Sequence, residues 1–186
     1  MSDPYLIVGL GNPGLEYERT RHNVGFWAVD DLHCRLKCSP WKGKFGGQYA
    51  KSDDGFVFLL KPQTYMNKSG EPTKQLAHFF KIATDHVIVI HDELDFEPGM
   101  VKLKVGGGAG GHNGLRSLIS CIGADFVRVR LGIGKPKSSD QGADHVLSAP
   151  SKLDMQVLES AAKTSADAAL SVVTNGVKLA MNQVNR

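Results

Sequence analysis

Short apolar runs divided by turn residues mark the strands predicted in the first half of the chain. Residues 6–8 (LIV) are predicted as a core strand, and residues 87–90 (VIVI) as a central strand covered on both faces. Residues 46–51 and 56–60 are predicted as two further strands, because they flank a turn at residues 52–55 (SDDG).

Two later segments, residues 101–105 and 127–133, alternate apolar and polar side chains and are also predicted as strands. Because successive side chains of a strand point to opposite faces, the cationic side chains of each segment share one face. These are Lys102 and Lys104 in the first strand and Arg128 and Arg130 in the second. Each strand is therefore expected to carry a stripe of positive charge.

Apolar residues at helical spacing predict the helices. They occur at residues 24–36, in the segment after Gly70, and at residues 115–122, 151–173 and 177–184. Ser151 is the N-cap candidate of the longest helix, and Asn175-Gly176 is its stop signal. The apolar face of this helix is predicted from Leu153, Val157, Leu158, Ala161 and Ala162. The chain shows no repeat, low-complexity tract or interdomain linker, so one compact domain is expected.

The composition is that of an ordinary globular protein. Of 186 residues, 41% are hydrophobic and 22% are charged, which suits one domain with a sizeable core. The chain does not open with a basic region before a long apolar segment, and no apolar run approaches the roughly 18 residues that cross a bilayer. A soluble, cytosolic protein is expected.

Three cysteines, Cys34, Cys38 and Cys121, are an odd set, which disfavours a disulfide framework and suits a reducing compartment. His33 with Cys34 and Cys38 could suggest a metal site. A second ligand pair is missing, however, so idle or buried thiols on a helix are the preferred interpretation.

The charge changes sign along the second half of the chain. Residues 81–100 hold one lysine and five acidic residues, whereas residues 101–137 hold seven Lys or Arg and one Asp. A basic block beside an acidic one suggests a polyanion-binding surface near a catalytic carboxylate. Solvated charge on strands explains the pattern equally well, so both interpretations stay open.

Polar residues follow the two buried strands. Residues 9–14 (GLGNPG) fit the dinucleotide pattern G-x-G-x-x-G, but a polar loop follows where an apolar helix should begin, and no second strand ends in an acidic residue at the required distance. This interpretation is set aside. In open α/β sheets ligands bind beyond the carboxyl ends of strands, which makes Asn12, His22 and Asp92 candidates by position. A carboxylate there can fix the tautomer of a histidine that acts as a general base, although Asp92 could instead cap a helix.

Two further loops are candidate binding segments. Residues 62–70 carry Tyr65, Met66 and Asn67 in a polar loop, for which a packing tyrosine beside a turn asparagine is the simpler interpretation. Residues 106–114 (GGGAGGHNG) lead into a helix. Glycines there let backbone N–H groups face a phosphate or an oxyanion, unless the loop is merely flexible.

Five ordered blocks of this sequence resemble the bacterial-type peptidyl-tRNA hydrolases over essentially the full length of the chain. They are VGLGNPGLEYERTRHNVG, KPQTYMNKSG, HDELDFEPG, KLKVGGGAGGHNGLRS and RVRLGIGKP. The resemblance implies a single α/β domain over residues 1–186, with a twisted mixed β-sheet sandwiched between α-helices. It also implies hydrolysis of the ester that joins a peptide, or an N-blocked aminoacyl group, to the 3′ end of tRNA.

The resemblance also implies roles for individual residues. His22 resembles the base that takes a proton from the attacking water, and Asp92 resembles its partner. Substrate contacts are implied for Asn12, Tyr17, Tyr65, Met66, Asn67 and Asn113, and contacts with tRNA phosphate for Lys104 and Arg130, with Lys102, Arg128 and His112 nearby. No metal, cofactor or membrane is implied, and peptidyl-tRNA is the expected partner of a monomer.

The sequence departs mildly from the family pattern in three places. Tyr65 stands where Phe is common, Lys135 where His or Arg is, and His145 where Tyr or Phe is. His145 lies in a polar segment, residues 135–150, which is predicted as a mobile flap. Two alternative functions stay open: a tRNA-binding module without catalysis, and a nucleoside- or phosphate-binding enzyme, which the glycine loop would favour.

Overall fold

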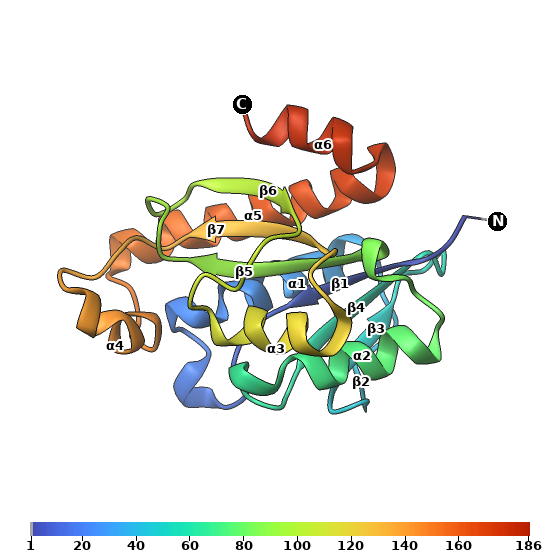
Figure 1. Cartoon of the computed structure of the whole chain (residues 1–186), viewed down its shortest axis with the longest axis horizontal. Coiled ribbons are helices and arrows are strands. Elements are labelled where there is room, and N and C mark those ends of the chain that lie inside the picture. Colours follow the sequence, from blue (N-terminus) through green and yellow to red (C-terminus); the bar gives the residue numbers. More distant parts are fainter. Residues whose placement is uncertain (1) are drawn as a thin grey trace.

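Seven strands form one mixed sheet in the order β2-β3-β4-β1-β5-β7-β6 (Figure 1). The computed structural model describes residues 2–186. The strands are β1 (Tyr5–Gly9), β2 (Lys42–Lys44), β3 (Gly47–Lys51), β4 (Val57–Pro62), β5 (Val87–Glu93), β6 (Val101–Val105) and β7 (Val127–Gly132). Strands β4, β1, β5 and β7 are parallel, whereas β2, β3 and β6 pair antiparallel at the two edges. The carboxyl ends of the parallel strands therefore meet at one end of the sheet.

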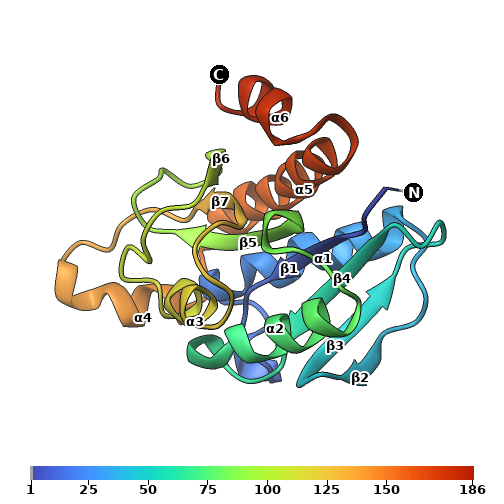
Figure 2. The same cartoon turned by 45° about the vertical axis from the view of Figure 1, so that its right-hand side comes forward.

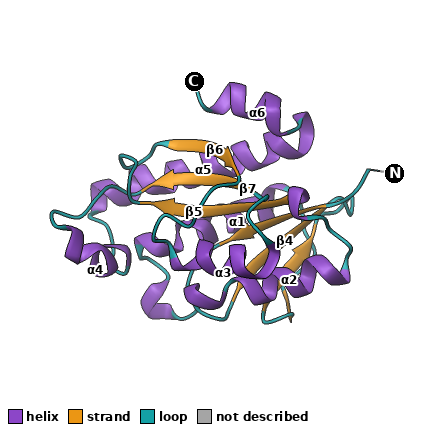
Figure 3. Ribbon diagram, in the orientation of Figure 1, coloured by secondary structure: helices purple, strands orange, loops and turns teal. Residues whose placement is uncertain are grey.

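Helices cover both faces of the sheet, which confirms the predicted α/β sandwich (Figures 2 and 3). They are α1 (Val24–Arg35), α2 (Gly70–Phe79), α3 (Asn113–Ile122), α4 (Gly142–Val146), α5 (Lys152–Asn175) and α6 (Val177–Val184). Helices α1 and α5 pack on one face and α2 and α3 on the other, while α6 lies against β6. In the described part of the chain, no helix is long and apolar enough to cross a bilayer.

The two-sided covering explains why the central strands are continuously apolar. In β1, Ile7 faces α1 and α5, whereas Leu6 and Val8 face α2 and α3. In β5, Ile88 and Val89 divide between the two faces in the same way. Because both side-chain rows are buried, a polar residue is tolerated only beyond the helices, at the strand ends.

Most predicted elements are confirmed within one or two residues. Strand β6 and helix α6 coincide with the predicted residues. Ser151 caps α5 by accepting the N–H of Asp154, and the helix stops before Gly176 with its φ of 83°. The prediction missed β2, because its sequence KGK has no apolar residue and is exposed throughout.

The predicted apolar face of α5 is partly wrong. Leu158, Ala161 and Ala162 are buried, but Leu153 is 71% exposed and Val157 is 37% exposed. At 3.6 residues per turn, Leu153 lies about 140° around the helix from Leu158. The prediction therefore joined residues from two sides of the helix.

Glycines let α1 lie directly on β1 and β5. A Cβ at Gly25 would be 2.4 Å from the carbonyl oxygen of Ile90, and one at Gly9 would be 2.2 Å from the carbonyl oxygen of Gly25. A Cβ at Gly11 would lie 2.7 Å from the ring of Phe26. The glycine-rich turn thus serves close packing, which brings the start of α1 to the carboxyl end of the sheet.

Candidate active site

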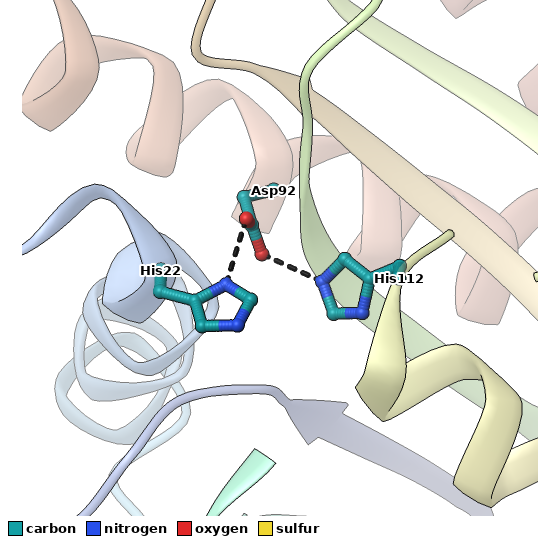
Figure 4. A group of neighbouring side chains, drawn as sticks. All are labelled: His22, Asp92 and His112. Atoms are coloured by element: carbon teal, nitrogen blue, oxygen red, sulfur yellow. Dashed lines mark hydrogen bonds and ion pairs between the residues drawn. The ribbon is translucent and has the colours of Figure 1, made fainter. Parts of the chain in front are cut away.

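His22 and Asp92 meet at the carboxyl end of the sheet, although 70 positions separate them (Figure 4). His22 lies in a single 3-10 turn, Arg21–Asn23, directly before α1, and Asp92 is the penultimate residue of β5. The Nδ1 atom of His22 is 2.8 Å from Oδ2 of Asp92. Both residues are buried, so water competes little for this hydrogen bond.

Asp92 holds a second imidazole as well, that of His112. The Nε2 atom of His112 lies 2.7 Å from Oδ1 of Asp92, on the side away from His22 (Figure 4). The other ring nitrogen of His112, Nδ1, accepts hydrogen bonds from the backbone N–H groups of Gly114 and Leu115 at the start of α3. Since Nδ1 accepts, Nε2 must carry the proton that is donated to Asp92.

Because His112 is the N-cap of α3, the glycine loop before this helix differs from the prediction. The sequence suggested that backbone N–H groups before α3 could face a phosphate or an oxyanion. The N–H groups of Gly114 and Leu115 are instead satisfied by the ring of His112, so that interpretation is wrong for these two groups. His112 lines the pocket with Asp92, and it also lines a second cavity together with Lys104, Arg128 and Arg130.

The hydrogen bond to Asp92 fixes the chemical state of His22. Because an ionised carboxylate only accepts, Nδ1 of His22 donates, and the neutral ring keeps its lone pair on Nε2. Burial works to lower the pKa of His22, but the charge of Asp92 and the hydrogen bond to it raise the pKa more, to above the ordinary value of 6.5. Nε2 is therefore the basic atom of the pair.

Asp92 stays ionised between the two imidazoles. Burial works to raise the pKa of its carboxyl group, but electrostatic attraction to His22 and His112 and the hydrogen bonds from them outweigh burial and hold the pKa well below its usual range. The neighbouring His91 is different, because burial and the nearby His112 lower its pKa to about 3. Nδ1 of His91 donates to the backbone oxygen of Asp92, 2.8 Å away. His91 is therefore a neutral, buried side chain that supports the backbone beside Asp92.

Asn12 follows β1 and is held by its neighbours. The backbone N–H of Met66 donates to Oδ1 of Asn12 at 2.7 Å. The side chain of Asn23 bonds both the backbone N–H and the backbone oxygen of Asn12, each at 2.9 Å. Because Oδ1 is occupied, the amide orientation is defined, and Nδ2 of Asn12 is a donor for the pocket that this residue lines.

These residues surround a cavity of about 480 Å³. Of the residues predicted to act in the site, eight line it: Asn12, His22, Tyr65, Met66, Asn67, Asp92, His112 and Asn113. Tyr17 lies outside the lining and packs edge-on against Tyr65, with ring centroids 6.2 Å apart. Met66 is 5% exposed and belongs to the core, whereas Asn67 and Asn113 are exposed.

Part of the remaining wall comes from the flap, which sequence reasoning did not include in the site. Gly142, Ala143, Val146 and Leu147 line the cavity from α4 and its end. Arg21, next to His22, anchors this segment through its guanidinium, which donates to the hydroxyl of Ser148 at 2.6 Å. His145 donates from Nε2 to the backbone oxygen of Gly134 at 3.0 Å, so its departure from an aromatic residue adds a polar anchor.

The basic side chains predicted on β6 and β7 do share one face, because Lys102 pairs with Arg130 and Lys104 with Arg128. Their availability differs. Arg128 is 3% exposed and donates to the backbone oxygens of Gly107 and Gly108. The guanidinium group of Arg128 is thus engaged by the glycine loop, so this geometry does not support direct binding of phosphate by Arg128.

Arg130 forms an ion pair with Glu93, whereas the ammonium group of Lys104 is exposed to solvent. Arg130 donates twice to Oε1 of Glu93, at 2.6 and 3.0 Å, and stacks on the ring of Phe96. Lys104 is exposed and forms no ion pair within residues 2–186. A phosphate group would meet Lys104 first and would have to compete with Glu93 for Arg130.

The fold and the pocket define an α/β enzyme with a histidine–aspartate pair at the carboxyl end of its sheet. Comparisons with known proteins agree on the family. The chain belongs to the peptidyl-tRNA hydrolase family, whose model matches residues 6–186. It hydrolyses the ester bond of peptidyl-tRNA.

Relatives and solved structures cover nearly the whole chain. The chain is 48% identical to the peptidyl-tRNA hydrolase of Alcanivorax borkumensis over 191 aligned residues, covering 100% of this chain and 98% of that protein. It is 44% identical to that of Methylococcus capsulatus, covering 97% and 98%. The crystal structure of peptidyl-tRNA hydrolase from Acinetobacter baumannii superposes with a TM-score of 0.92 at 42% identity, covering 100% of this chain and 96% of that one.

Proposed function

We propose that His22 is the general base of this hydrolase and that Asp92 orients it. The observation that carries the proposal is the 2.8 Å bond from Nδ1 of His22 to Asp92, which leaves the lone pair of Nε2 for a water molecule in the cavity. General-base assistance of this kind contributes about 10²- to 10⁴-fold to a reaction rate.

In the proposed reaction, Nε2 of His22 takes a proton from water as the water oxygen attacks the ester carbonyl. The imidazolium that forms is stabilised by the charge of Asp92. It then returns the proton to the departing 3′ oxygen of the ribose, which restores the neutral base. In this scheme the imidazole alone activates the water, and no cofactor takes part.

We assign the amides of the pocket to recognition of the peptide. Asn12 offers Nδ2, and Asn67 and Asn113 lie exposed around the same cavity. Neutral amides suit a peptide backbone, which presents both donors and acceptors. An N-blocking group adds a carbonyl and an amide N–H that these side chains can bond, so we propose that the contacts favour N-blocked substrates.

We place the tRNA along the face of β6 and β7 that carries Lys104 and Lys102. Arg130 would join them by exchanging Glu93 for a phosphate group, while Arg128 acts indirectly by holding the glycine loop. Tyr17 and Tyr65, which pack together beside the cavity, would contact the tRNA end. We further propose that the protein is a monomer, since one chain supplies the residues that line the cavity. We propose that it acts in the cytoplasm, where its substrate peptidyl-tRNA is formed.

The proposal is tested by measuring release of the acyl group from N-acetylated aminoacyl-tRNA under single-turnover conditions. His22→Ala should slow hydrolysis about 10²- to 10⁴-fold and should retain tRNA binding. His78→Ala is the matched control, because His78 is exposed on α2, and its rate should equal that of the unaltered enzyme. Normal hydrolysis by His22→Ala would refute the role of His22.

A further inference from the structure

Asp92 is shared between two imidazoles that reach it from opposite faces of the sheet (Figure 4). His22 precedes α1 on one face and bonds Oδ2 at 2.8 Å. His112 precedes α3 on the other face and bonds Oδ1 at 2.7 Å. The side chain of Asp92 is 2% exposed, so neighbouring groups rather than bulk water stabilise its charge.

We propose that His112 is a positioning residue of this hydrolase, which takes up part of the charge of Asp92 and thereby keeps His22 in the neutral form that accepts a proton from water. In this scheme His112 acts only through Asp92 and not on the ester or the water. The inference rests on the proposed role of His22 as the base, and it gives a function to the second imidazole of the cluster.

The cap of α3 fixes His112 as a hydrogen-bond donor to Asp92. Nδ1 of His112 accepts the backbone N–H groups of Gly114 and Leu115, at 3.1 and 3.3 Å, and a proton on Nδ1 would break both bonds. The proton of the ring is therefore on Nε2 and points at Asp92. Helix α3 thus sets both the tautomer and the orientation of this ring.

A donor on one oxygen of Asp92 weakens the attraction of the carboxylate for a proton on His22. The N–H of His112 partly compensates the negative charge, so less of that charge stabilises an imidazolium at His22. The positive end of the same N–H also lies near His22, since the two ring centroids are 5.1 Å apart. Both effects favour the neutral form of His22.

The reaction needs this balance, because Asp92 acts on His22 in two ways. Its charge and hydrogen bond raise the pKa of His22 above the ordinary value, although burial works to lower it. A base with a higher pKa holds a proton more firmly, but an imidazole that is already protonated cannot accept one from water. By sharing the charge, His112 lets Asp92 orient His22 without keeping it protonated.

The other charged groups around the cavity have partners of their own. The remaining titratable side chains that line it are those of Tyr65, Glu93 and Asp95. Arg130 and Lys135 pair with the two carboxylates, and the guanidinium of Arg21 bonds the flap. The ring of His91, centred 5.2 Å from that of His112, is neutral because of its low pKa. This leaves His112 as the group that shares the charge of Asp92 with His22.

Two amide substitutions separate the two bonds of His112. In His112→Asn the short amide ends near the former Nδ1, so it can cap α3 but cannot reach Asp92. In His112→Gln the longer amide brings an N–H near the former Nε2, so it can donate to Asp92 while the cap is lost. The first variant therefore lacks the donor, and the second lacks the cap.

NMR titration of the ring protons of His22 in the substrate-free enzyme measures the effect. The midpoint should rise by about 0.5–1 unit in His112→Asn, because a hydrogen bond to an ionised group is worth about one to two pKa units and only part of this reaches His22. His112→Gln should titrate like the unaltered enzyme despite a lower unfolding temperature. His78→Asn, at an exposed position of α2, is the control and should change neither property.

The direction of the change is decisive. Asp92→Asn removes the charge itself and should move the midpoint of His22 down, opposite to His112→Asn. An unchanged or lower midpoint in His112→Asn would overturn the inference. An equal rise in His112→Gln would overturn it as well, because the cap rather than the donor would then be responsible.

The pH dependence of kcat/KM connects the titration to catalysis. Below the midpoint, His112→Asn should release the acyl group of N-acetylated aminoacyl-tRNA about three- to tenfold more slowly, and the loss should shrink as the pH rises. A merely structural defect would lower the rate at every pH, and that result would overturn the role of His112.

The two measurements distinguish this inference from the proposed function. If the NMR midpoint rises but the rate profile does not follow it, His22 is not the base, while the effect of His112 on His22 stands. If His22→Ala is inactive and the midpoint in His112→Asn does not move, the role of His112 fails and the catalytic proposal stands.

Discussion

At the residue scale, the chemistry of the pocket depends on what Asp92 holds. Its two oxygens bind His22 and His112, and only His22 keeps a nitrogen lone pair that faces the cavity. The sequence predicted that Asn12, His22 and Asp92 would gather, because each follows or precedes an element at the carboxyl end of the sheet. The contact with His112 was not predictable, since strand and helix periodicity give no distance between loops on opposite faces.

The raised pKa of His22 predicts the acid side of the pH profile. The base acts when neutral, so kcat/KM should fall as the pH decreases through a midpoint above the ordinary 6.5 of an imidazole. Asp92→Asn removes the charge that raises this pKa, so the midpoint should move to lower pH and the plateau should fall. The profile is measured in buffer freed of transition metals, and an unmoved midpoint in Asp92→Asn would contradict the electrostatic role of Asp92.

At the element scale, the packing of α1 on the sheet positions His22. Helical spacing predicted α1, and short apolar runs that end in turn or polar residues predicted β1 and β5. These patterns could not reveal that Gly9 and Gly25 are contact points, since a glycine in a turn and a glycine in a tight helix–strand contact look alike in sequence. Periodicity likewise placed Arg128 on the correct face without showing that the side chain is buried.

Gly25→Ala tests this contact. The added Cβ would lie 2.4 Å from the carbonyl oxygen of Ile90, which should destabilise the fold by about 1–3 kcal/mol through overpacking and should lower kcat by shifting the start of α1. Gly43→Ala in the exposed strand β2 is the control, because nothing lies within 4 Å of its Cβ position. Thermal unfolding and kcat are measured for both, and equal effects would rule out a special role of the α1 contact.

At the scale of the whole molecule, charge is divided between the pocket and the neighbouring strands. Carboxylates line the cavity, and lysines and arginines occupy one face of β6 and β7. The sequence showed this division as an acidic block followed by a basic one. It did not show that Glu93 and the glycine loop already engage Arg130 and Arg128, which leaves Lys104 as the exposed cation of the pair predicted to bind phosphate.

Lys104→Gln should therefore weaken tRNA binding and reduce the slope of log affinity against log salt by about one, since one phosphate contact is lost. Hydrolysis of a minimal acyl-adenosine ester should not change, because this substrate lacks the phosphate. Lys163→Gln, at an exposed position of α5, should behave like the unaltered enzyme. Equal losses on tRNA and on the minimal ester would point to a distorted pocket instead.

The pairing of His22 and Asp92 is tested most directly by a double-mutant cycle on single-turnover hydrolysis. Residues that act as one unit are strongly non-additive. His22→Ala combined with Asp92→Ala should therefore be no slower than His22→Ala alone. If the two losses multiply instead, Asp92 acts independently of the imidazole, and the histidine–aspartate base proposed for this pocket is wrong.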